Sequence, residues 1–186
     1  MKCMSHQPTM NSKRIIDGPE KPSRVLAIDP GTRTLGYADF SEAELIDYGL
    51  RYFKSCRRIE QLLDEVEVVI SRLILEKQPE VIILEKTSFS QITNNVRLTL
   101  VSTRIKSVAR RLKTKIVEYS PKTIRAIVSN DGLSTKFDVA KIIVSKYPEM
   151  RLLIRNQTPS ARNLFFNITD AVACGQAYLD RKSRSR

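Results

Sequence analysis

Residues 25–40 read VLAIDPGTRTLGYADF, and they contain the clearest indications of strands and a turn in the chain. Its first four residues are apolar and partly β-branched, which predicts a short buried strand. The strand stops at Asp29, because the Pro-Gly that follows is typical of a turn. The chain then returns as a second strand over residues 35–40. The stretch therefore predicts antiparallel strands, the first of which ends in an acidic side chain.

The rest of the chain alternates between strand and helix patterns. Residues 45–53 add a third strand, and a helical period then runs over residues 59–74. An all-apolar run over residues 81–84 predicts a second buried strand that ends in Glu85. Further elements are expected as a strand over residues 115–119 and as helices over residues 98–112, 121–128, 135–147 and 167–179. This order predicts an α/β fold with a five-stranded mixed sheet flanked by helices.

The length of the chain limits the number of domains, and its net charge limits the classes of binding partner. The chain has 186 residues, so we expect one domain over residues 24–180, between a flexible extension at 1–23 and a basic tail at 181–186. An excess of Lys and Arg gives a net charge of +12. Such an excess favours polyanions, so nucleic acid is the first expected partner and an anionic membrane surface the second. No apolar run is long enough to span a bilayer.

The number and spacing of the cysteines and histidines exclude several kinds of catalytic and metal site. Cys3, Cys56 and Cys174 are far apart and lack CxxC spacing, so neither a disulfide framework nor a zinc ribbon is indicated. The only histidine, His6, lies in the polar extension, which leaves no base for a Ser-His-Asp or Cys-His site. We therefore expect catalysis by carboxylates, lysines or an oxygen-bound metal, in a reducing compartment. The expected location is the cytoplasm with its nucleoid, with an organelle or a viral factory left open.

Three acids stand at the ends of predicted elements. Asp29 and Glu85 follow buried strands, and Asp170 opens the last predicted helix, where it also suits the helix dipole. Ligands of open α/β sheets bind at strand ends, and clustered carboxylates repel one another unless a divalent cation neutralises them. The pattern predicts a site for Mg²⁺ or Mn²⁺, with two ions about 4 Å apart that activate a water for phosphodiester attack. The alternatives are that Glu85 is a surface residue and Asp170 only a helix cap.

The stretch at 25–40 closely resembles the first strand and turn of RuvC-type Holliday junction resolvases, with the acid, the Pro-Gly and the later Gly-Tyr in register. The resemblance continues through VIILEKTSF at 81–89, EYSPKTIR at 118–125, the segment 132–140 and ITDAVACGQAYL at 168–179. It implies a ribonuclease H-like fold and a homodimer that places its two sites across a four-way junction. It also implies Mg²⁺-dependent, symmetrical nicking of DNA, with a branch-migration helicase as a further partner.

The resemblance implies that the three acids bind the metals and act in catalysis, Asp29 as the first acid, Glu85 as the second and Asp170 as the last. This chain departs from the family at Asn167, where a further acid is common. Asn167 then becomes a neutral metal ligand, with reduced metal affinity or activity as the consequence. The alternative acid is Asp138, for which an ordinary solvated helix residue is the favoured interpretation.

Two basic residues and one aromatic residue complete the implied site. Lys136 and Arg125 match positions where the family has basic residues near the scissile phosphate, so both are predicted DNA-binding residues and Lys136 also a catalytic one. Phe89 resembles the aromatic wedge that enters the junction centre, which makes it a third predicted DNA-binding residue. The alternatives are exposed salt-bridging side chains for Lys136 and Arg125, and a core or dimer-interface role for Phe89.

The region around the helix at 98–112 leaves two questions open. Its many basic side chains either meet phosphates or form a solvated helix face, and its apolar series either belongs to the core or packs across a two-fold axis. Two competing functions also stay open. One is a ribonuclease H-like nuclease that acts on RNA, and the other is a non-cleaving junction-binding protein, which the Asn167 departure supports.

Overall fold

The computed structural model describes residues 23–54, 58–86, 96–131, 133–154 and 159–185, and the side chains of residues 152–154 and 159–162 lie outside this description. Its centre is a five-stranded sheet in the order β3-β2-β1-β4-β5. The strands are β1 (Arg24–Asp29), β2 (Thr34–Ser41), β3 (Glu44–Tyr52), β4 (Val81–Glu85) and β5 (Lys115–Tyr119). β2 is antiparallel to both β1 and β3, whereas β4 runs parallel to β1 and β5. The predicted mixed sheet is confirmed.

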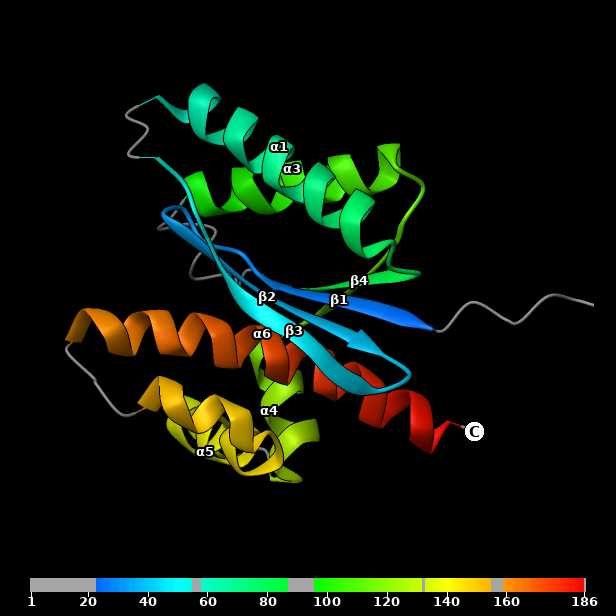
Figure 1. Ribbon diagram of the computed structural model, residues 1–186, viewed down its shortest axis with the longest axis vertical. Helices are drawn as coiled ribbons and strands as arrows, with labels where there is room; N and C mark the ends of the chain where they lie inside the picture. Colours follow the sequence, from blue (N-terminus) through cyan, green and yellow to red (C-terminus); the bar gives the residue numbers. More distant parts are fainter. Residues whose placement is uncertain (1–22, 55–57, 87–95, 132, 155–158, 186) are drawn as a thin grey trace, which may run out of the picture.

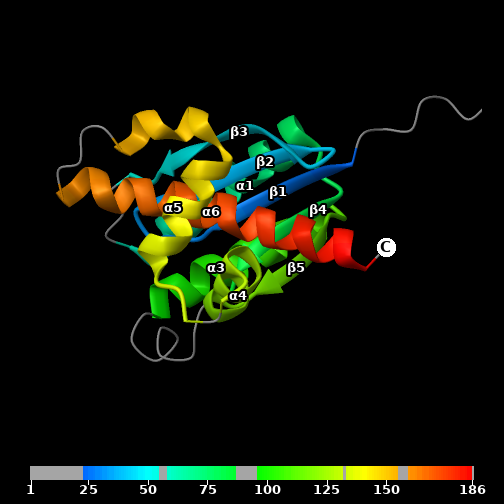
Figure 2. The same cartoon turned by 90° about the horizontal axis from the view of Figure 1, so that it is seen from below.

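Helices cover both faces of this sheet (Figure 1). One face carries α1 (Ile59–Lys77) and α3 (Val96–Arg111). The other face carries α4 (Pro121–Ser129), α5 (Lys136–Lys146), the short 3-10 helix η1 (Pro148–Ile154) and α6 (Pro159–Arg184). Figure 2 shows this second face, with α6 running along the sheet between α5 and α4. Within the described ranges, none of the helices combines the length and apolar character that crossing a membrane requires.

Side-chain alternation divides the core into two layers. In β1, Leu26 and Ile28 belong to the layer under α1 and α3, whereas Ala27 belongs to the layer under α6. β4 follows the same alternation, because it pairs with β1 in parallel register. Asp29 and Glu85 continue the series that faces α6. The alternation therefore sends both acids to the same face of the sheet.

The last helix lies unusually close to the sheet. A Cβ added at Gly175 of α6 would come within 2.3 Å of the Phe40 ring, and one added at Gly36 of β2 within 2.0 Å of the Asn167 carbonyl oxygen. Only glycine leaves room for these approaches. The two glycines therefore allow the backbone of α6 to rest directly on β1 and β2, with Asn167 next to the strand that pairs with Asp29.

The predicted start of the last helix at Asn167 is wrong. α6 begins at Pro159, so Asp170 lies in the interior of the helix and neither opens nor caps it. The reason is that the buried side chains of Phe165 and Ile168 continue the helical apolar period through a segment with many polar residues. Asp170 therefore lies between buried residues of α6, Ile168 before it and Ala171 after it, and their packing fixes its position.

The end of α6 includes most of the predicted basic tail. Residues 181–184 are helical, and the Lys182 Nζ lies 3.5 Å from the hydroxyl of Ser23, just before β1. Figure 1 shows this end of α6 beside the start of β1. Asp29 ends the same strand. These basic residues and Asp29 therefore lie at opposite ends of the strands.

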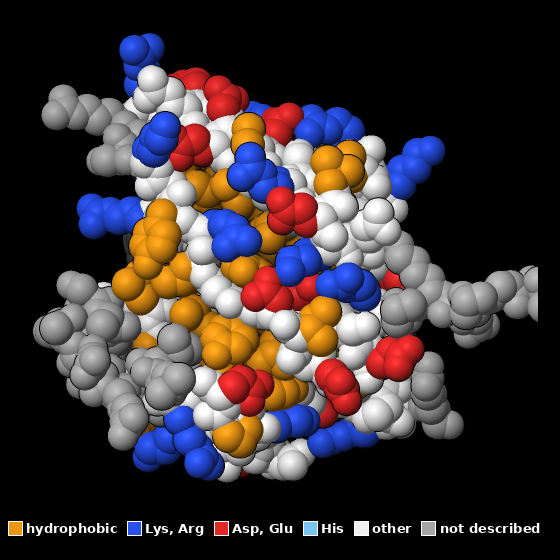
Figure 3. All heavy atoms as spheres, in the orientation of Figure 1, with side chains coloured by type: hydrophobic (Ala, Val, Ile, Leu, Met, Phe, Trp, Pro, Cys, Tyr) orange, Lys and Arg blue, Asp and Glu red, His pale blue; other side chains and the backbone are white. Residues whose placement is uncertain are grey.

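Several basic side chains of the α3 region are paired within the protein. Arg104 and Arg111 both contact Glu67 of α1, at 2.5 and 2.7 Å, and Lys106 contacts Glu118 of β5 at 3.2 Å. Figure 3 shows Lys and Arg side chains scattered over this view of the molecule, with acidic side chains among them. These three basic residues therefore agree with the alternative of a solvated helix face, on which each of them pairs with an acidic side chain of the protein.

Candidate active site

Asp29 and Glu85 end two neighbouring parallel strands. Ile28 pairs with Leu84, so Asp29 and Glu85 are the next residues on β1 and β4. Both continue the side-chain series that faces α6. The predicted meeting of these two acids at one edge of the sheet is therefore a consequence of strand register and side-chain alternation.

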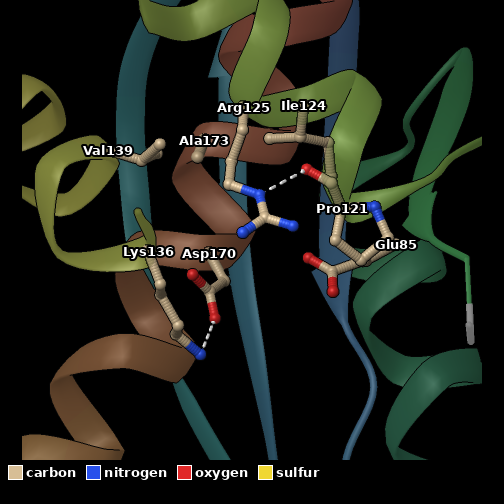
Figure 4. A pocket seen from close by; sticks show the side chains of 8 residues that line it. All are labelled: Glu85, Pro121, Ile124, Arg125, Lys136, Val139, Asp170 and Ala173. Carbon is tan, nitrogen blue, oxygen red and sulfur yellow. Dashed lines mark hydrogen bonds and ion pairs between the residues drawn. The ribbon is translucent and has the colours of Figure 1, made fainter. Parts of the chain in front are cut away.

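Asp170 reaches the same place from α6. It lines a pocket of about 220 Å³ together with Glu85, and the other lining residues are Pro121, Ile124, Arg125, Lys136, Val139 and Ala173. Figure 4 shows Glu85 entering from one side and Asp170 and Lys136 from the other. Asp29 lies close enough to interact electrostatically with Asp170 and Glu85. Three acids that are far apart in the sequence are thus gathered at one end of the sheet.

Lys136 forms an ion pair with Asp170 inside this pocket, and its side chain is still 51% exposed. Its position follows from the start of α5, where Thr135 and Asp138 form a reciprocal capping box. The Thr135 side chain accepts a hydrogen bond from the Asp138 backbone, and the Asp138 carboxylate accepts one from the Thr135 backbone at 3.1 Å. This places Asp138 as a helix-capping residue outside the pocket lining, in agreement with the favoured interpretation of Asp138 as an ordinary helix residue.

Arg125 enters from α4, which begins directly after β5. Ser120 caps this helix by accepting a hydrogen bond from the Thr123 backbone, and Pro121 occupies the first helical position. The Arg125 Nε donates a hydrogen bond to the Pro121 carbonyl oxygen at 3.3 Å. In Figure 4 the guanidinium points into the space between the carboxyl groups of Asp170 and Glu85. Two cations therefore approach the acids from two different helices.

The acids carry more negative charge than these cations offset. Burial raises the pKa of Asp29 well above its usual range, and repulsion from Asp170 and Glu85 adds to this. Burial, followed by repulsion from Asp170, raises the pKa of Glu85 to about 7, although Lys136 and Arg125 oppose the shift. Burial also raises the pKa of Asp170, against the attraction of Lys136. Without a further cation, the site therefore favours protonation of its carboxyl groups.

A divalent cation fits this donor chemistry. Carboxylate oxygens are the ligands that Mg²⁺ and Mn²⁺ prefer, and the pKa values of Asp29 and Glu85 are raised first by burial and then by repulsion from neighbouring acids, which a bound cation would relieve. In the described part of the chain, no three acidic, cysteine or histidine side chains are arranged as ligands of one metal ion. Lys136 contacts the Asp170 carboxylate instead. Binding of a metal to the acids would therefore require these side chains to rearrange.

Asn167 lies about one helical turn before Asp170 and has a partner outside the pocket. Its side-chain nitrogen donates a hydrogen bond to the Thr34 hydroxyl at 2.8 Å, which ties α6 to the start of β2. Asn167 is not among the residues that line the pocket. Its role as a metal ligand stays a prediction. Phe89 lies outside the described residues, so its predicted contact with the junction centre also stays a prediction.

Sequence reasoning missed Cys174, which lies under the site. Its thiol is fully buried, and burial raises its pKa well above the usual range, with Glu85, Asp29 and Asp170 adding to the shift. The available signal was its spacing, because Cys174 follows Asp170 by four residues and so lies one turn further along the same helix face. The pocket wall of Ile124, Val139 and Ala173 was also missed, because its residues look like ordinary core positions in the sequence.

Sequence comparison identifies related proteins. The chain matches the family described as crossover junction endodeoxyribonuclease RuvC over residues 25–174. The RuvC protein of Chlorobaculum parvum is 30% identical over 168 residues, which cover 84% of this chain and 80% of that protein. The RuvC protein of Akkermansia muciniphila is 27% identical over 162 residues, which cover 84% of this chain and 90% of that protein.

Comparison with solved structures finds the same fold in a RuvC protein and in a mitochondrial resolvase. The structure of Thermus thermophilus RuvC matches with a TM-score of 0.69 at 16% identity, over 87% of this chain and 96% of that one. The yeast mitochondrial Holliday junction resolvase matches with a TM-score of 0.67 at 16% identity, over 92% of this chain and 84% of that one. The family match runs from β1 into α6 and so includes Asp29, Glu85 and Asp170. The chain belongs to the RuvC family of crossover junction endodeoxyribonucleases.

Proposed function

We propose that this protein resolves four-way DNA junctions by metal-dependent hydrolysis of phosphodiester bonds. The single observation that carries the proposal is the gathering of Asp29, Glu85 and Asp170 at one end of the sheet, with Lys136 and Arg125 beside them. Membership of the RuvC family supports DNA junctions as the substrate class. A related structure, T. thermophilus RuvC, is known in complex with a Holliday junction substrate.

The three acids would hold Mg²⁺, with two ions at each site and Mn²⁺ as a substitute. The chemistry that such ions supply is activation of a water molecule and stabilisation of the leaving oxygen. The chain contributes three carboxylates fixed by β1, β4 and α6. Their pKa values are raised in the metal-free protein, so metal binding competes with protons at this site.

Lys136 and Arg125 would act on the scissile phosphate. Lys136 holds Asp170 in the metal-free protein, and its half-exposed side chain is free to turn toward a phosphate once Asp170 has another cation. Arg125 is held near Glu85 by its own helix, so it is suited to bind a nonbridging phosphate oxygen. Each residue thereby places positive charge where negative charge develops during cleavage.

A four-way junction presents two equivalent strands to be cut, so we propose that the protein acts as a homodimer with one site for each strand. A branch-migration helicase is proposed as a further partner, and the DNA-containing compartment of the cell as the location. Measurement of molecular mass in solution, alone and with a junction, tests the dimer. A monomer on the junction would contradict it.

Asn167 supports a second candidate function, a protein that binds junctions without cutting them. Its amide contacts Thr34, at a position where a further acid is common in the family. In this case the site would bind metal weakly, and junction affinity would persist without cleavage.

Cleavage of a labelled mobile four-way junction in Mg²⁺ separates these functions, with linear duplex DNA and single-stranded RNA as competing substrates. We expect paired, symmetrical nicks in the junction. Asp29→Asn should abolish the nicks and keep junction binding. Asp64→Asn is the matched control, because Asp64 is an exposed acid on α1, and it should cut normally. Binding without nicks in the wild type would favour the non-cleaving protein, and cleavage of RNA alone would overturn the substrate class.

A further inference from the structure

Two large apolar side chains stay exposed beside the pocket. Leu133 is 90% exposed and Phe137 is 54% exposed, and they lie on either side of Lys136 in the sequence. Single exposed apolar residues are common on protein surfaces. Here two of them lie within five residues, on either side of Lys136, whose side chain lines the candidate active site, and we call residues 133–137 the rim of the pocket.

Hydrogen bonds hold this rim in place. The Leu133 backbone N–H donates to the Asp131 carboxylate at 2.9 Å, and the Asp131 backbone N–H donates to the Ser129 hydroxyl at 3.3 Å. Thr135 and Asp138 fix the next turn through the capping box. Hydrogen bonds therefore fix the backbone both before and after the segment that carries the exposed apolar side chains.

The direction of Phe137 follows from that of Lys136. Lys136 turns toward Asp170, and the next side chain of an α-helix points about 100° further around the axis. The Phe137 side chain therefore leaves the helix about a quarter turn away from the Lys136 side chain, and Phe137 is not among the residues that line the pocket. The core face of α5 is already formed by Val139, Ala140, Ile143 and Val144, so Phe137 is not needed to complete the core.

The charge around the ring suits a nucleic acid strand. The Lys141 Nζ lies 4.5 Å from the centre of the Phe137 ring, whereas the Lys136 Nζ lies 5.0 Å from the centre of the Phe166 ring and pairs with Asp170. A half-exposed aromatic ring beside one lysine, and next in sequence to a second lysine that lines the pocket, suits the bases and phosphates of a DNA strand.

We infer that Phe137, with Leu133, stacks against unpaired nucleobases next to the scissile phosphate and so positions the DNA strand for cleavage. The inference rests on the proposed function and adds the contact on the α5 side of the pocket. Strands that are opened at a junction expose the faces of their bases, and an aromatic ring can stack on any base. Phe137 is in this sense a positioning residue, because it contacts the substrate away from the reacting atoms.

The test uses a four-way junction with the fluorescent base 2-aminopurine placed in turn at each nucleotide beside the cut. Stacking on an aromatic ring quenches this base. Quenching and affinity are measured in the Asp29→Asn background, which keeps the DNA intact, and single-turnover cleavage is measured in the wild-type background. Phe137→Ala and Leu133→Ala are compared with Phe137→Trp, which keeps an aromatic ring. Ile142→Ala is the matched control, because Ile142 is an exposed apolar residue on the same helix.

We expect Phe137→Ala to lose the quenching at one position and to lower junction affinity or cleavage by about 5- to 100-fold. Phe137→Trp should retain both, Leu133→Ala should show a smaller loss than Phe137→Ala, and Ile142→Ala should behave as the wild type. Equal quenching and cleavage in Phe137→Ala and Ile142→Ala, with a wild type that resolves junctions, would overturn the inference and leave the proposed function standing. A wild type that cuts no junction would overturn both.

Discussion

Two groups of buried charges lie on opposite faces of the same sheet, and they are built differently. Under α1, Asp39 is fully buried but contacts Arg24 at 2.6 Å and Lys77 at 3.5 Å, and Lys77 also contacts Asp47 at 2.6 Å. Each acid of this group has a basic partner. Under α6, the three acids of the candidate site crowd together, and their pKa values rise.

The difference separates a structural cluster from a functional one. An ion pair offsets the charge of the buried acid within the protein itself, although among the described residues the Arg24 Nε and one Asp39 carboxylate oxygen are buried without a hydrogen-bond partner. A group of acids with too few cations is unfavourable in the folded protein and gains stability from a ligand of positive charge. The contrast between the two groups therefore supports metal binding under α6.

Asp29→Asn is expected to lower the rate of junction cleavage by at least about a thousandfold, because it removes a carboxylate shared by the proposed metal ions. The folded state should be retained, since the substitution removes a repelled charge. Single-turnover cleavage and thermal unfolding of the same preparation check the two statements. Cleavage close to the wild-type rate would remove Asp29 from the site.

Asp39→Ala is expected to destabilise the protein by about 2–4 kcal/mol, because it removes the buried carboxylate that pairs with the partly buried Arg24 guanidinium, whose charge then lacks its closest partner. Urea unfolding at pH 7 measures this loss. At a temperature where the variant remains folded, its cleavage rate per folded molecule should equal that of the wild type. A variant that is stable but inactive would contradict the structural role of this cluster.

Glu85→Gln is expected to stabilise the metal-free protein by roughly 1–3 kcal/mol at pH 8. Folding raises the pKa of Glu85 to about 7 from an ordinary value near 4.5, so folding favours the protonated form. The stability that protonation provides is present below about pH 4.5 and is lost as the pH rises through about 7. Unfolding in EDTA from pH 4.5 to pH 8 should show a decline in the wild type that is smaller in Glu85→Gln. Parallel curves would refute the shift.

Mg²⁺ is expected to raise the stability of the wild type at pH 8 by about 1.4 kcal/mol at ten times its dissociation constant. The increase should be much smaller in Asp29→Asn, whereas Asp39→Asn should keep it, although that variant is less stable. Thermal unfolding with and without Mg²⁺ gives both values. An equal increase in Asp29→Asn would place the bound ion somewhere other than the candidate site.

The acids could be located from the sequence because their positions depend on local patterns. Asp29 and Glu85 follow apolar runs that form buried strands, and parallel strands place their carboxyl ends at one edge. The position of Asp170 was predicted for the wrong reason, because a helix start was inferred where α6 continues through its interior. The polar residues before it obscured the apolar period that Phe165 and Ile168 maintain.

Other features depend on tertiary contacts that no local pattern encodes. The Lys136 contact with Asp170 requires α5 and α6 to meet, and the contact of Arg125 with its own helix fixes how far it reaches into the pocket. The pairing of Arg104 and Arg111 with Glu67 likewise depends on the packing of α3 against α1. From the sequence alone, these arginines were indistinguishable from phosphate-binding residues.

The close seating of α6 on β1 and β2 has a consequence for the order in which the protein becomes active. Asp29 and Glu85 lie on strands that leave the ribosome early, whereas Asp170 lies on the last helix of the fold. During synthesis, the third carboxylate is missing until α6 has emerged and docked against Gly36 and Phe40. A growing chain therefore lacks one of the three acids of the candidate site, and we expect DNA cleavage only once the domain has folded.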